Sequence, residues 1–272
     1  MINGFEVAMR QMGIWHDQFA KTEKNRFRAD GVTPYSLHLL AVFKRAYDDG
    51  IRSISDLISA LFHDVLEDTK VTSTEFIKFL STLEQKPSFA RSVFQTCSDL
   101  TDFNDKFPII DTLSRKERKN ITNSHIANYA CPGALIVKIY DRWHNLFSLN
   151  MQPSFRKRYL EESEGLFKAL RDGFERTAPL VESTAAINIA KKRLEMMEKE
   201  YYGTDFFIVI NSKTDEIVNG CIPSDRSEYS SDQDLIFFPI SRDQFLNLGD
   251  ATTNNFLLER WLARKAHGEQ NG

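Results

Sequence analysis

Apolar residues recur at helical spacing along the first 200 residues of this 272-residue chain. Segments such as residues 36–50 and 133–149 place leucine, isoleucine, valine and aromatic side chains three or four positions apart. That spacing puts the apolar side chains on one face of an α-helix. It therefore predicts a bundle of amphipathic helices that bury these faces against one another.

The same periodicity sets the expected helix positions. We expect helices over residues 4–21, 36–50, 53–69, 76–86, 87–102, 115–130, 133–149, 154–173 and 180–202. Thr72 and Glu75 have the spacing of a capping box ahead of the fourth of these helices. Residues 103–114 are expected to form a loop.

The pattern changes near residue 203. Short runs rich in aromatic and β-branched residues follow at 205–210, 216–222 and 234–240, and turn-rich sequence separates them. Residues 253–266 return to helical spacing. The sequence thus predicts a mainly α fold with a small C-terminal α+β appendage, in which we find no motif that carries chemistry.

Composition narrows the class of protein. The chain is 42% hydrophobic, enough for a substantial core, and its net charge of -3 does not suggest a general nucleic-acid binder. Its three cysteines are far apart and form no CxxC pair, which favours reduced thiols over a disulfide framework. No run approaches the roughly 18 apolar residues of a membrane span. We expect a cytoplasmic protein that binds neither nucleic acid nor membrane.

The segment LFHDVLEDTK, residues 61–70, combines apolar residues at helical spacing with His63, Asp64, Glu67 and Asp68. In a helix, residues four apart lie one above the other, so His63 would stack over Glu67 and Asp64 over Asp68. A bound divalent ion would offset the cost of burying these carboxylates. The alternative is a solvated helix end with a surface acidic cluster.

Two further segments favour the metal interpretation. TPYSLHLLAV places His38 in an apolar series, where a core histidine is the usual alternative. VKIYDRWHNL places Asp141 among apolar residues, where it needs a partner such as a metal or Arg142. Asn145 follows Asp141 by one turn. Histidine and aspartate ligands from separate helices form a mixed nitrogen and oxygen set that suits Mn²⁺.

These residues resemble a known family. The order His38, His63–Asp64, Asp141 matches the HD-domain metal-dependent phosphohydrolases. HDVLEDT and KIYDRWHNL resemble the hydrolase domain of RelA/SpoT-type alarmone enzymes, and the chain looks closest to stand-alone small alarmone hydrolases over residues 5–175. TPYSLHLLAV is similar to the family's PYxxHPxxVA segment, except that Leu39 replaces the proline. The resemblance implies an HD-domain helical bundle over residues 1–200, followed by an extension of unknown role at 201–272.

The resemblance also implies roles for individual residues. The implied metal ligands are His38, His63, Asp64 and Asp141. Glu67 and Asp68 would handle the attacking water. Substrate contacts would come from Arg28, with Arg26 as its rival, and from Lys138 and Asn145. Arg142 would brace Asp141.

The activity implied by the resemblance is Mn²⁺-dependent hydrolysis of the 3′-pyrophosphate of guanosine tetra- or pentaphosphate, which releases pyrophosphate and GDP or GTP. An HD phosphohydrolase acting on another nucleotide, such as an adenosine alarmone, NADPH or a nucleotide monophosphate, is the first alternative. A module that binds an alarmone without cleaving it ranks lower, because both residues of the acidic pair and all four implied ligands are present. The C-terminal extension could dock a partner, with the hydrolase serving as antidote to a toxic alarmone synthetase.

Overall fold

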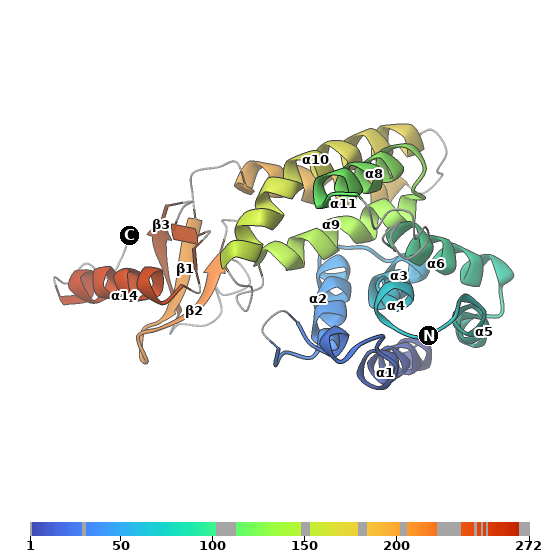
Figure 1. Cartoon of the computed structure of the whole chain (residues 1–272), viewed down its shortest axis with the longest axis horizontal. Helices are drawn as coiled ribbons and strands as arrows, with labels where there is room; N and C mark the ends of the chain where they lie inside the picture. The colour runs from blue at the N-terminus through green and yellow to red at the C-terminus, as the bar shows by residue number, and fades with distance from the viewer. Residues whose placement is uncertain are drawn as a thin grey trace. The chain divides into compact units, whose positions relative to one another are not determined.

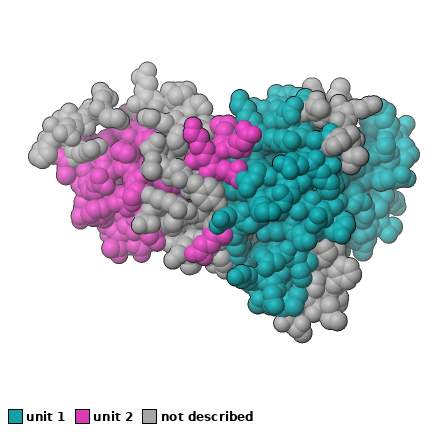
Figure 2. Space-filling view, turned by 90° about the horizontal axis from the view of Figure 1, so that it is seen from above, with its two compact units in different colours: residues 1–144, 162–194 teal, residues 145–161, 195–272 magenta. Residues whose placement is uncertain are grey.

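The computed structural model describes residues 2–28, 31–101, 113–147, 153–178, 184–201, 206–221, 235–241, 244–245, 247–248 and 250–266. The chain divides into two compact units, residues 1–144 with 162–194 and residues 145–161 with 195–272 (Figure 2). Most of the loop expected at 103–114 lies outside the described residues. The expected domain boundary at residue 200 stays a prediction.

The first unit begins with helices that share one hydrophobic core. These are α1 (Ile2–Gln18), α2 (Tyr35–Asp48), α3 (Ile54–Phe62), α5 (Ser73–Leu83) and α6 (Pro87–Leu100), with a 3-10 turn at Glu23–Arg26. The ring of Trp15 lies edge-on to Phe62, Phe76 and Phe79, with ring centroids 5.1–5.9 Å apart. Edge-to-face packing of large buried rings stabilises the core beyond the area it buries.

Capping boxes form at the N-termini of two of the described helices. The predicted capping box at α5 is confirmed: the Thr72 side chain accepts from the Glu75 backbone N–H, and the Glu75 side chain accepts from the Thr72 backbone N–H. Ser114 and Glu117 form a second box at the start of α8 (Arg115–Asn128). Each box satisfies backbone donors that the first helical turn leaves open.

The next helices are α9 (Pro132–Phe147), α10 (Pro153–Thr177) and α11 (Thr184–Tyr201). A Cβ atom added to Gly173 of α10 would lie 2.8 Å from Leu135 Cδ2 and 2.9 Å from the Ile126 carbonyl oxygen. Because real Cβ contacts are never that short, only glycine lets α10 approach α8 and α9 so closely. This packing supports α9, which carries part of the site described below.

The helix expected over residues 53–69 is interrupted, and the prediction of one continuous helix was wrong. α3 ends at Phe62, and the chain resumes as a single turn, α4 (Val65–Asp68). The Asp64 carbonyl accepts from the Glu67 and Asp68 amides at 3.1 and 2.8 Å, so helical bonding restarts at Asp64. Adjacent residues on a continuous helix do not face each other. The break is what brings the side chains of His63 and Asp64 together.

The second unit contains a small sheet and a helix. Strands β1 (Phe206–Asn211), β2 (Glu216–Cys221) and β3 (Leu235–Ile240) form an antiparallel sheet in the order β2-β1-β3. Ile208 pairs with Gly220 on one side and with Phe238 on the other. Helix α14 (Ala251–Ala266) follows the sheet in the sequence.

Hydrogen bonds join the turn between β1 and β2 to side chains of α14. Asp215 adopts a left-handed backbone with φ 55°, which aspartate tolerates better than most residues. Its carboxylate accepts a hydrogen bond of 2.9 Å from Trp261 Nε1 and one of 2.8 Å from Lys265 Nζ. Together the two units confirm the predicted mainly α fold with a small α+β part (Figure 1).

In the described part of the chain, no helix is both long enough and apolar enough to cross a bilayer.

Candidate active site

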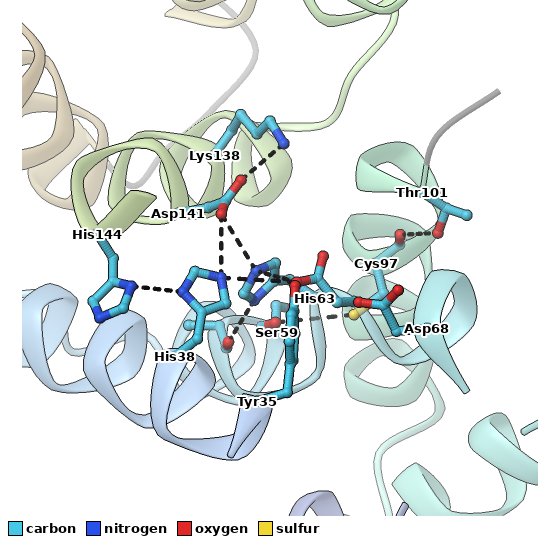
Figure 3. Close-up of polar contacts among 12 residues, drawn as sticks. Tyr35, His38, Ser59, His63, Asp68, Cys97, Thr101, Lys138, Asp141 and His144 are labelled. Atoms are coloured by element: carbon cyan, nitrogen blue, oxygen red, sulfur yellow. Dashed lines mark hydrogen bonds and ion pairs between the residues drawn. The ribbon is translucent and has the colours of Figure 1, made fainter. Parts of the chain in front are cut away.

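Three buried side chains from separate parts of the first unit converge on one point. His38 comes from α2, His63 from the residue that ends α3, and Asp141 from α9 (Figure 3). Asp141 Oδ1 lies 3.3 Å from His38 Nε2 and 3.8 Å from His63 Nε2. One potential ligand atom of each residue lies within 4.8 Å of the others, so the cluster could hold a metal ion.

Asp64, the fourth ligand implied by the resemblance, contacts both histidines. Its Oδ2 lies 3.0 Å from His63 Nε2 and 3.8 Å from His38 Nε2. The tight group of three does not include it. Asp64 therefore stands next to the cluster, and its role as a ligand stays a prediction.

Each imidazole turns a buried Nε2 atom toward a carboxylate. The Nε2 atom of His63 lies 3.0 Å from Asp64 Oδ2, and that of His38 lies 3.3 Å from Asp141 Oδ1. His63 Nδ1 lies 2.9 Å from the Ala60 carbonyl, which can only accept, so Nδ1 carries a proton. A histidine that donates through one ring nitrogen presents the other to an ion in a fixed orientation.

The charges at this point favour positive charge beside the two carboxylates. Although burial alone lowers it, the adjacent Asp64 and Asp141 carboxylates raise the pKa of His63 to about 10. Although burial alone raises them, the pKa values of both carboxyls are held below the ordinary range, that of Asp64 by His63 and that of Asp141 by Lys138. Two buried carboxylates beside an imidazole need a positive charge among them, which a proton on His63 or a divalent ion can supply.

Lys138 lies on α9, three residues before Asp141, and bonds to it. Its Nζ donates a hydrogen bond of 2.9 Å to Asp141 Oδ2, the carboxylate oxygen opposite the one that faces the histidines (Figure 3). Lys138 thus braces Asp141, the role that the resemblance implied for Arg142, and the implied contact of Lys138 with the substrate stays a prediction. Arg142 is buried on the same helix.

The acidic pair lies on α4. Asp68 accepts a hydrogen bond from the Asn25 side chain, and burial together with the Asp64 charge raises the pKa of Asp68 to about 7. Glu67 is half-buried on the same turn. A carboxyl group whose pKa lies near neutrality suits general base or acid catalysis at physiological pH.

Arg28 and Arg26, the two arginines predicted as rival substrate contacts, lie in different surroundings. The guanidinium of Arg28 lies 5.5 Å from the centre of the Tyr35 ring, and burial together with the Arg28 charge lowers the pKa of His38 to about 4. Arg26 instead pairs with Glu23 at 2.8 Å. Asn145 is buried one turn beyond Asp141 on α9 and falls in the second compact unit.

Two residues outside the predicted ligands, acidic pair and substrate contacts also contact the site. The Tyr35 hydroxyl donates a hydrogen bond of 2.6 Å to Asp64 Oδ2. His144 Nδ1 lies 2.8 Å from His38 Nδ1. Both residues stand inside the motifs that mark the site, and His144 follows Asp141 by three positions, the spacing that puts two side chains on one helix face. That spacing is the signal that could have found it.

The fold and the site define a helical protein with a candidate centre for a divalent ion beside an acidic pair. Particular relatives support the predicted resemblance. The chain is 34% identical over 119 residues to the human and mouse proteins named guanosine-3′,5′-bis(diphosphate) 3′-pyrophosphohydrolase MESH1. It is 31% identical over 130 residues to the Xenopus tropicalis protein of that name. These matches cover 43–47% of this chain and 57–63% of the relatives' length.

No protein-family model matches the chain. A solved structure described as a metazoan ortholog of SpoT that hydrolyzes ppGpp is 20% identical, with a TM-score of 0.46 over 72% of this chain and 95% of that one.

Proposed function

We propose that this chain hydrolyses the 3′-pyrophosphate of guanosine tetra- or pentaphosphate with Mn²⁺ and releases pyrophosphate and GDP or GTP. The observation that carries the proposal is the convergence of His38, His63 and Asp141 beside Asp68. Relatives named for this activity support the choice of substrate.

The ion would be held by His38, His63 and Asp141, with Asp64 completing the set. Two imidazole nitrogens and two carboxylates form a mixed donor set of the kind that Mn²⁺ accepts. When bound, the ion supplies charge that polarises a phosphoryl oxygen and makes water more acidic. Lys138 keeps Asp141 ionised, because its ammonium group stabilises the carboxylate.

Asp68 and Glu67 act on the attacking water. Asp68 accepts its proton, because a carboxyl with a pKa of about 7 is substantially ionised at neutral pH and is still basic enough to take a proton. Asn25 holds the Asp68 carboxylate through its side-chain amide. Glu67, one position earlier on α4, orients the water.

The nucleotide is bound by basic and polar groups. Arg28 packs against the base, a role for which its planar guanidinium beside the Tyr35 ring is suited. Arg26 is the weaker candidate, because Glu23 already pairs with it. Asn145 contacts the sugar or phosphate. Lys138 can also meet a phosphate, because its ammonium group carries three protons and the bond to Asp141 uses one of them.

The test is a substrate panel assayed with Mn²⁺ and purified protein. Guanosine tetraphosphate, its adenosine analogue, NADPH and a nucleotide monophosphate are compared for the wild type and for a Glu67→Gln, Asp68→Asn double variant. A Glu6→Gln, Asp172→Asn double variant is the matched control, because both of its carboxylates are exposed.

The proposal predicts that the wild type and the control release pyrophosphate and GDP from the guanosine compound, and that the active-site variant does not. Turnover of another nucleotide alone would replace the substrate. Equal rates in the active-site variant would overturn the role of the acidic pair.

A further inference from the structure

The His38 ring contacts a second histidine through Nδ1, the ring nitrogen that does not face Asp141. His38 Nδ1 and His144 Nδ1 lie 2.8 Å apart, and the two ring centroids are separated by 4.8 Å (Figure 3). His38 is 1% exposed, so water does not compete for this contact. α9 therefore brings two groups to the site, the Asp141 carboxylate and, three residues later, the ring that meets His38.

A hydrogen bond between two imidazole nitrogens needs one donor and one acceptor. If His38 donates from Nδ1, its Nε2 carries a lone pair that points toward Asp141 Oδ1, 3.3 Å away. If His144 donates instead, a neutral His38 carries its proton on Nε2, where the ion has to bind. The direction of this one bond therefore decides whether His38 can be a ligand.

We propose that His144 is a positioning residue of the metal site: its Nδ1 accepts the hydrogen bond from His38 and so holds His38 in the tautomer that presents Nε2 to the ion. This inference rests on the proposed function for the presence of a divalent ion. It adds a residue to which no role was assigned from the sequence.

The two histidines of the cluster differ in how their tautomers are set. The partner of His63 Nδ1 is the Ala60 carbonyl, which can only accept. The partner of His38 Nδ1 is a ring that can accept or donate. His63 is thus a fixed ligand, whereas His38 becomes one when His144 takes the acceptor role. Such outer partners typically change metal affinity by about 10–100-fold when they are removed.

The experiment compares two variants of nearly equal size. His144→Asn keeps a side-chain oxygen that can accept from His38 Nδ1, and His144→Leu has no acceptor. Mn²⁺ affinity is measured on the full chain from the electron paramagnetic resonance signal of free Mn²⁺, without any substrate. His125→Leu is the control, because His125 on α8 faces Asp99 at 3.5 Å instead of the cluster.

The proposal predicts that His144→Leu weakens Mn²⁺ binding by about 10–100-fold, while His144→Asn stays within a few-fold of the wild type. Zinc-loaded wild type should show His38 protonated at Nδ1 in ¹⁵N spectra. Equal Mn²⁺ affinity in the wild type and a folded leucine variant would overturn it, as would equal loss in both variants or no Mn²⁺ binding by the wild type.

If the leucine variant does not fold, the asparagine variant and the wild-type ¹⁵N spectrum still test the proposal. A spectrum with His38 protonated at Nε2 then overturns the proposal. Failure of the proposed function looks different: the wild type binds Mn²⁺, the leucine variant binds it weakly, and guanosine tetraphosphate is not cleaved.

Discussion

Lys138 and Asp141 lie three residues apart on α9, and the lysine ammonium donates a 2.9 Å hydrogen bond to one carboxylate oxygen of Asp141. The other oxygen faces His38 Nε2 at 3.3 Å. One oxygen of Asp141 is thus bonded to the Lys138 ammonium group, and the other faces the point where a bound ion would sit. This arrangement keeps a buried carboxylate ionised before any metal arrives.

Replacing Lys138 should expose the cost of that buried charge. Lys138→Met is expected to destabilise the metal-free protein by about 3 kcal/mol, because it removes the ammonium group bonded to the buried Asp141 carboxylate. Mn²⁺ should restore part of the loss, since the ion supplies the missing charge. Thermal unfolding with EDTA and with Mn²⁺ measures both effects. Lys168→Met, which breaks the exposed Lys168–Asp172 pair, should change little in either condition.

Tyr35 should stabilise the Asp64 carboxylate, as Lys138 stabilises that of Asp141. Tyr35→Phe removes a 2.6 Å hydrogen bond to a carboxylate and is expected to cost about 2 kcal/mol of stability. It should also weaken Mn²⁺ binding by about 10-fold, because Asp64 loses the group that orients it. Urea unfolding and Mn²⁺ titration give the two values. Tyr129→Phe at an exposed position is the control, and equal behaviour of the two variants would show that the bond to Asp64 is unimportant.

His16 is a buried histidine whose two ring nitrogens have no hydrogen-bond partner among the described residues. Its ring stacks on Tyr35 with centroids 5.5 Å apart. Phenylalanine can keep this stacking without the unsatisfied nitrogens, so His16→Phe should stabilise the protein by about 1 kcal/mol at pH 7. Lower stability of the variant at pH 7 would indicate that the nitrogens have a partner, such as a buried water.

The advantage of His16→Phe should grow in acid. Burial lowers the pKa of His16 to about 4 from an ordinary value of 6.5. The unfolded chain therefore binds more protons than the folded one between these values, and the wild type loses stability as the pH falls from 6.5 to 4. The variant lacks this loss, at most about 1.4 kcal/mol per pH unit. Urea unfolding at pH 7.5, 6 and 5 measures it, and a pH-independent difference would contradict the assignment.

Asp68 should set the acid limb of the activity. Its carboxyl must be ionised to accept a proton. Its pKa is raised to about 7 in the metal-free protein, and a bound cation would lower it from there. We expect kcat/KM to rise with pH up to about 7 at most. Asp68→Asn should lower the rate by about 10²–10⁴-fold and abolish that rise. A pH–rate profile of unchanged shape in the variant would assign the limb to another group.

The sequence could predict the helices and the three residues that meet in the cluster. Apolar spacing located α2 and α9, and the charged residues within those patterns marked His38 and Asp141. The interruption between α3 and α4 was missed, because His63, Asp64, Glu67 and Asp68 fit helical spacing whether or not the helix is continuous. Only the backbone bonds to the Asp64 carbonyl reveal the break.

The hydrogen-bond partners of polar side chains were harder to predict from the sequence than the helices on which these side chains lie. Lys138 was expected to contact the substrate, and the sequence does not say that its ammonium turns back to Asp141 on the same helix. The bond between His144 and His38 joins α9 to α2 across 106 positions. No local pattern encodes a contact at that separation, because it depends on how the two helices pack.

The most direct test of a metal-dependent hydrolase is one titration of Mn²⁺ into metal-free protein with guanosine tetraphosphate present. Bound ion and released pyrophosphate are measured in the same samples. Pyrophosphate release should appear as one ion binds per chain and should be lost on adding EDTA. Release that is unaffected by EDTA, or a fully bound ion with no release, would contradict it.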